Sequence, residues 1–136
     1  MHDCVHSGMA IEWNMILAVA AGGGMGAALR YGVAGMVQQW AGDDFPYGTL
    51  MVNILGSLLL GFIVQLAEMK TGPGPWLKLF LTVGLCGGFT TFSTFSLESF
   101  RLLQDGSYLL AAGNIAGSLL LCLFGIWAGI VLARLV

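Results

Sequence analysis

Charged side chains are scarce in this sequence of 136 residues. Lysine and arginine together number 5 and aspartate and glutamate 7, so that 9% of the residues are charged, against roughly a quarter in an ordinary soluble domain. A soluble domain covers its apolar core with such residues, and there are too few here for that coat. Because 57% of the residues are hydrophobic, a bilayer must cover the apolar surface instead. The composition excludes a soluble domain and predicts an all-α integral membrane protein.

Groups for catalysis and for disulfide bonds are also lacking. Cys4, Cys86 and Cys122 show no paired spacing and are interpreted as apolar fillers. His2, Cys4 and His6 could suggest a metal site, but they lie on a terminal tail and are interpreted as incidental. No constellation of histidine, cysteine and carboxylate offers an acid, a base and a nucleophile. We therefore expect that the protein is not an enzyme.

Long apolar stretches make up most of the chain. A helix that crosses a hydrocarbon core about 30 Å thick needs about 20 apolar residues. Segments of this length predict four transmembrane helices, at about 15–38, 49–67, 75–103 and 107–133. The connections are short, so residues 15–136 form one membrane domain after a tail, residues 1–14, to which we assign no function. We expect a multi-pass protein of the cell (inner) membrane.

The loop charges give only a weak signal for orientation. Four spans place Lys70, Lys78 and Arg134 on one side, against Arg101 and, if it lies shallow, Arg30 on the other. Orientation follows the difference in lysine and arginine between the two sides. The small difference leaves two alternatives: a single topology, or insertion in both directions, which would let two identical subunits pair antiparallel.

Small residues recur four apart in three of the predicted spans. Ala18, Gly22 and Gly26 form one such row, and the pairs that follow it are Gly84 with Gly88, Gly113 with Gly117, and Gly125 with Gly129. The glycines at 22–26 do not indicate a dinucleotide site, because no strand precedes them and no suitably spaced acidic residue follows. We expect each row to let another helix backbone approach closely.

The third apolar segment is unusually polar. Hydroxyl groups are present at Thr90, Thr91, Ser93, Thr94 and Ser96, directly after a pair of glycines. Glycine and β-branched threonine are weak helix formers, so we expect this helix to break at mid-membrane. Unpaired backbone at that depth is tolerated where it is buried in protein or lines an ion site. Carbonyls would suit a cation, and amides or hydroxyl protons an anion.

Two phenylalanines follow the expected break. Phe92 and Phe95 are three residues apart, so their rings would share one helix face. Ordinary packing would explain two phenylalanines alone. However, ring edges carry partial positive charge, and beside hydroxyl and amide donors they would stabilise a small anion. For the lone polar residues Asn53, Asn114 and Ser118, hydrogen bonds between helices are the simpler interpretation.

Three motifs in this order resemble the Fluc (CrcB) fluoride channel family, over nearly all of the chain from about Met15. They are GGGMGAALRY at 22–31, GTLMVNILGS at 48–57 and GGFTTFSTFS at 87–96. The resemblance implies an antiparallel, dual-topology homodimer with two pores that passively exports fluoride from the cytoplasm and lowers its toxicity. Some members are paired, oppositely oriented subunits, and the weak charge bias here favours the homodimer.

The resemblance also implies roles for individual residues. A structural sodium ion at the dimer centre would be held by the backbone carbonyls of Gly87 and Thr90. Arg30 would lie near an aqueous vestibule that attracts anions. The residues that would line the fluoride pore are Asn53, Phe92, Ser93, Thr94, Phe95, Asn114 and Ser118. Asn114 departs from the pattern, because some members have tyrosine there.

A small four-helix, proton-coupled multidrug exporter is the alternative function. Such a transporter needs a carboxylate within the membrane to exchange protons for a cationic substrate. Glu12, Glu68 and Glu98 lie at the ends of predicted spans instead. Glu98, which follows the third motif, is retained as a candidate for the pore mouth.

Overall fold

The computed structural model describes residues 12–69 and 72–136, and every regular element within them is a helix. These elements are α1 (Trp13–Ala41), α2 (Tyr47–Glu68), α3 (Pro75–Leu79), the π-helical stretch η1 (Phe80–Cys86), α4 (Gly87–Phe89), α5 (Phe92–Gln104) and α6 (Tyr108–Arg134). Four segments are long and apolar enough to cross a membrane, which confirms the four predicted helices. Four residues of the sequence analysis lie outside the described residues: His2, Cys4 and His6, interpreted as incidental, and the loop residue Lys70.

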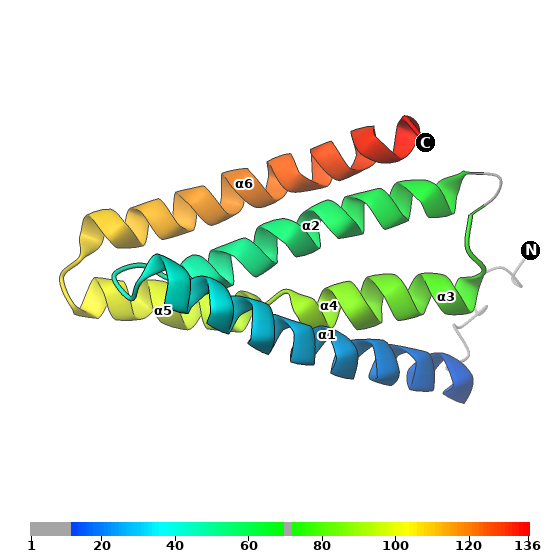
Figure 1. Ribbon diagram of the computed structural model, residues 1–136, viewed down its shortest axis with the longest axis horizontal. Helices are drawn as coiled ribbons and strands as arrows, with labels where there is room; N and C mark the ends of the chain where they lie inside the picture. The colour runs from blue at the N-terminus through cyan, green and yellow to red at the C-terminus, as the bar shows by residue number, and fades with distance from the viewer. Residues whose placement is uncertain (1–11, 70–71) are drawn as a thin grey trace, which may run out of the picture.

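The four segments run alternately up and down in an elongated bundle (Figure 1). The α1–α2 and α5–α6 connections lie at one end, here called the turn end, and α3 lies at the other. The most extensive contacts join α2 to α6 and α1 to η1. The third segment thus lies beside α1, and it also contacts α2.

Helix α1 packs on the third segment through glycines. A Cβ atom at Gly22 would lie 3.0 Å from the Cα of Gly84, and one at Gly88 would lie 3.0 Å from the Cα of Gly23. A Cβ at Gly26 would meet the Leu85 carbonyl oxygen. Lipid tails are as apolar as leucine, so helices in a bilayer associate through such close backbone packing. The predicted close approach along the first helix is confirmed.

Helices α2 and α6 also pack closely through glycines, but at only one of the two glycine rows predicted in the fourth span. A Cβ at Gly125 would lie 3.1 Å from the Ile54 carbonyl oxygen, and one at Gly129 would lie 2.8 Å from the Phe62 amide nitrogen. A Cβ at Gly113 or Gly117, by contrast, would have no described atom of another helix within 4 Å. The prediction for this earlier pair is wrong within the protomer, because that face of α6 points away from the other described helices.

The third segment bends at Thr90 and Thr91 (Figure 1). Thr90, with φ −84° and ψ 162°, and Thr91, with φ −153° and ψ 114°, both have extended backbone. The π-helical turns of η1 precede the bend, and such turns are frequent near functional sites. The bend lies where the glycine and threonine pairs indicated a weak helix. Its depth in a membrane stays a prediction.

Candidate functional site

Asn53 holds the backbone of the bend. From α2, its Nδ2 atom donates to the Thr91 carbonyl oxygen at 3.1 Å, and its Oδ1 atom accepts from the Thr91 amide at 2.7 Å. Thr91 is only 7% exposed and has extended backbone, so neither water nor a helix can pair its amide and carbonyl. The Asn53 side chain pairs both groups instead. The side chain thus replaces the helical partners that the bend removes.

Thr91 also begins α5. Its Oγ1 atom accepts from the Thr94 amide at 3.2 Å and donates to the Thr94 hydroxyl at 3.0 Å, as an N-cap residue does. The Ser93 hydroxyl lies 3.4 Å from the same oxygen. Three of the hydroxyl groups that made the segment look polar therefore form one local network.

These side-chain bonds affect two carbonyl groups. In a continuous α-helix the Thr91 amide would bond to the Gly87 carbonyl, and the Thr94 amide to the Thr90 carbonyl. Here the first amide bonds to Asn53 and the second to the Thr91 hydroxyl. Gly87 and Thr90 thus lose their usual helical donors, and Gly87 is exposed.

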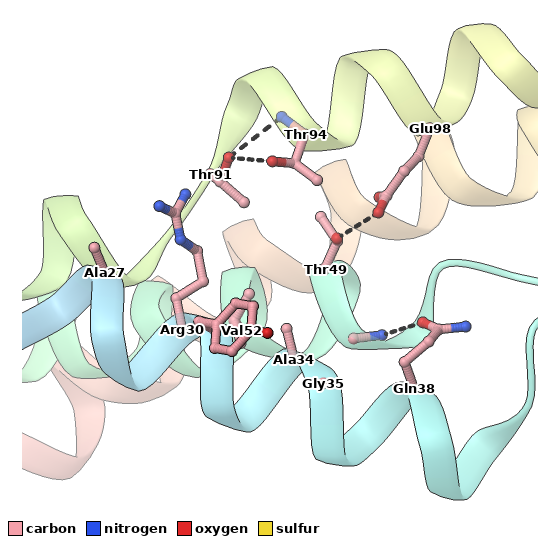
Figure 2. Close-up of a pocket in the computed structure, with 12 residues that line it drawn as sticks. Ala27, Arg30, Ala34, Gly35, Gln38, Thr49, Val52, Thr91, Thr94 and Glu98 are labelled. Atoms are coloured by element: carbon pink, nitrogen blue, oxygen red, sulfur yellow. Dashed lines mark hydrogen bonds between the residues drawn. The ribbon is translucent and has the colours of Figure 1, made fainter.

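A hollow of about 440 Å³ lies between α1, α2 and α5 and is here called the central hollow (Figure 2). Its lining includes Arg30, Gln38, Thr49, Thr91, Thr94 and Glu98. Arg30 extends from α1 toward the Thr91 side of the hollow (Figure 2). The hydrogen bonds among residues 12–69 and 72–136 leave its guanidinium group without a partner. The hollow therefore combines a positive charge with hydroxyl groups.

Glu98 lies where the central hollow meets a second one. A space of about 240 Å³ at the turn end, the end hollow, is lined by Gln38, Glu98, Arg101 and residues of both turns. Thr49 donates to the Glu98 Oε1 atom at 2.8 Å, while Oε2 is buried without a partner among the described residues. The structure thus places this pore-mouth candidate at the junction of two hollows.

A third space, the bend hollow, lies on the other side of Thr91. It has a volume of about 230 Å³, and its polar lining includes Asn53, Ser57, Thr82 and Thr90. Thr91 lines both this hollow and the central one, and Phe92 closes part of the bend hollow. The end and central hollows thus share Gln38 and Glu98 as lining residues, and the central and bend hollows share Thr91.

The two phenylalanines lie together, as their spacing predicted. The ring centroids of Phe92 and Phe95 are 5.5 Å apart and the rings are tilted by 45°. Phe92 is 79% exposed, and Ser93 and Ser96 are exposed on the same helix. A large ring and several hydroxyl groups thus share a surface of α5 that suits neither lipid nor water well.

Asn114 and Ser118 lie elsewhere, between α5 and α6. The Asn114 Nδ2 atom donates to the Ser99 hydroxyl at 2.9 Å, and Ser118 donates to the Asn114 Oδ1 atom at 3.5 Å. All three residues are buried. The bond from Asn114 to Ser99 is a hydrogen bond between helices, as the simpler interpretation of the sequence expected. The pore role of Asn114 and Ser118 stays a prediction.

Sequence reasoning did not single out Gln38 or Thr49, although both line the central hollow. The signal in the sequence was that Gln38 is a polar residue near the end of the first apolar span, and that Thr49 is one near the start of the second. For a cation, no group of three histidine, cysteine or acidic residues is gathered among the described residues. A bound cation would therefore rely on backbone or hydroxyl oxygens in this part of the chain.

Comparison with known proteins gives a consistent result. Residues 17–130 match the family model described as CrcB-like protein, Camphor Resistance (CrcB). Proteins named fluoride-specific ion channel FluC are similar over most of their length. The one from Geobacter sulfurreducens is 50% identical over 119 residues, which are 88% of this chain and 96% of that protein. The one from Nitrobacter winogradskyi is 43% identical over 126 residues, 93% of this chain and 100% of the relative. This chain therefore belongs to the CrcB-like protein family.

Proposed function

We propose that this protein is a fluoride-selective channel that lets fluoride leave the cytoplasm passively, as a multi-pass protein of the cell membrane. The observation that carries the proposal is the likeness to relatives named fluoride-specific ion channels, which match over nearly their full length. The same names support a transport protein rather than an enzyme. They do not favour the multidrug exporter.

The three hollows supply a path for a small anion. Arg30 places a positive charge in the central hollow, and Thr49 and Thr94 place hydroxyl groups there. An anion drawn in by Arg30 would exchange hydration water for the Arg30 guanidinium and the Thr94 hydroxyl, since Thr49 donates its proton to Glu98. Glu98 stands at the far end, where the central hollow meets the end hollow.

The exposed surface of α5 supports an antiparallel homodimer. In a single copy Phe92 is 79% exposed, and its neighbours in this membrane segment are polar. A second copy would cover this ring and leave its edge available to an anion together with Phe95, Ser93 and Asn53. The weak charge difference between the two sides permits the opposite insertion that this arrangement needs. The bend at Thr90 and Thr91 would then lie at mid-membrane.

The carbonyls of Gly87 and Thr90 fit a structural sodium ion at the dimer centre. Both lose their helical donors to side-chain bonds at the bend, and carbonyl oxygens are the ligands that hard cations prefer. Each copy would contribute the same pair. Sodium would supply positive charge that offsets these carbonyl dipoles and holds the two bends together.

Fluoride efflux from liposomes that contain the purified protein tests the function. We expect fluoride to leave rapidly while chloride stays, compared with protein-free vesicles. Efflux equal to that of protein-free vesicles, with leakage of chloride or a cation, would contradict the proposal. A reporter fused to the C-terminus should appear on both sides of the membrane, and a reporter on one side alone would contradict dual topology. Replacing sodium by a large organic cation should lower the melting temperature of the purified dimer.

A further inference from the structure

Gln38, near the end of α1, joins three parts of the α1–α2 connection. Its Nε2 atom donates to the carbonyl oxygens of Gly42 and of Phe45, the latter at 2.9 Å. Its Oε1 atom accepts from the Gly48 amide at 3.0 Å (Figure 2). One side chain thus bonds to the end of α1, to the loop and to the first turn of α2.

The connection has few other means of holding its shape. Helix α2 begins after Pro46 without a side-chain cap, although the amides of its first turn need acceptors. Gly42 has a φ of 100°, which only glycine adopts easily. Gln38 supplies the missing acceptor from another helix and pairs two carbonyls of the loop. It therefore fixes where α2 begins.

This position matters because the first turn of α2 carries Thr49. Gly48, the residue that Gln38 bonds, packs so closely on α1 that a Cβ would lie 3.0 Å from the Ala34 carbonyl carbon. Thr49 follows directly and donates to Glu98 at 2.8 Å. Gln38 and Glu98 both line the central and the end hollows. Gln38 and Glu98 therefore lie between the two hollows, and Gly48 and Thr49 line the central hollow beside them.

We propose that Gln38 is a positioning residue that sets this junction by holding Thr49 against Glu98. The proposal rests on the proposed channel function and adds a residue to the exit of its path. Gln38 acts through Thr49, and its own bonds are all to backbone groups.

A double-mutant cycle in the liposome efflux assay tests the proposal, with Gln38→Met, Thr49→Val and the combined variant. The adjacent residue Gln39 is exposed, so Gln39→Met is the matched control. We expect Gln38→Met to slow fluoride efflux about fivefold, the effect of one lost positioning hydrogen bond. Gln39→Met should leave efflux unchanged. In the Thr49→Val background Gln38→Met should add little, because coupled residues are not additive.

Gln38→Glu provides a second test if the methionine variant does not fold. It keeps the acceptor for the Gly48 amide, loses both donors and adds a negative charge at the junction. Efflux should fall about fivefold or more and recover partly at high ionic strength, since salt screens the charge. Wild-type efflux at every ionic strength would overturn the proposal, as would independent, multiplicative losses in the cycle. If the wild-type protein itself does not conduct fluoride, the proposed function fails instead.

Discussion

The bond pair between Asn53 and Thr91 gives the most direct test of how the bend is held. Asn53→Leu keeps the approximate size of the side chain but removes both hydrogen bonds, of 3.1 and 2.7 Å. Thr91 is 7% exposed, so its amide and carbonyl would be left largely without water. Each unpaired buried group costs about 1–3 kcal/mol. Removing both bonds should therefore lower the free energy of unfolding by roughly 2–6 kcal/mol. The loss should be nearer the lower value if water enters from the bend hollow and bonds these groups.

Unfolding of the purified protein in detergent measures this loss, and the efflux assay measures its effect on transport. We expect fluoride efflux to fall with stability, because the bend positions Thr91 between the central and bend hollows. Asn53→Asp keeps the acceptor for the Thr91 amide and should retain more stability than Asn53→Leu. If Asn53→Leu had wild-type stability and efflux, the bend would not depend on this side chain.

Asn114 offers a matched comparison, because it is also a buried asparagine in an apolar helix. Its partners are the hydroxyl groups of Ser99 and Ser118, which can rotate to bond backbone carbonyls of their own helices. Asn114→Leu should therefore cost less than about 1 kcal/mol, a typical value for side-chain bonds between membrane helices. An equal or larger loss than for Asn53→Leu would refute the distinction between backbone and side-chain partners.

Three further variants test packing, charge and the aromatic pair. Gly129→Ala should destabilise the protein by about 1–3 kcal/mol, as overpacking does, because the new methyl group would meet the Leu58 carbonyl; unfolding in detergent measures it. Arg30→Gln should slow fluoride efflux severalfold at low ionic strength and less at high ionic strength, since salt screens the lost attraction. Phe92→Ile should slow efflux while size-exclusion chromatography shows an unchanged oligomer, because the ring edge beside Phe95 is removed.

Each of these variants has a control in the same chain. Gly113→Ala, on the same helix as Gly129, has open space around it and should be neutral or slightly stabilising. Arg134→Gln removes a charge that bonds Gln65 outside the central hollow and should leave efflux unchanged. Phe100→Ile removes another exposed ring of α5 and should also be silent. Effects as large in the controls as in the test variants would contradict the assigned positions.

The sequence predicted the helices and the weak point of the third segment, because both depend on local composition. Runs of apolar residues identify the spans, and glycine with β-branched threonine weakens a helix wherever it lies. The π-helical stretch η1 was not predicted, since its residues differ little from those of an ordinary apolar helix. Glycine spacing predicted close packing equally for 113 with 117 and for 125 with 129, yet only the second pair contacts α2.

By itself, then, the sequence determined a four-helix membrane protein with a polar, weakly helical segment and a likeness to fluoride channels. The tertiary structure decided which polar groups meet. Asn53 reaches Thr91, Asn114 reaches Ser99, and Gln38 lies at the same junction as Glu98. The physical reason is that a hydrogen bond depends on a few ångströms of separation between residues far apart in the chain. Only the packing of the helices sets that separation.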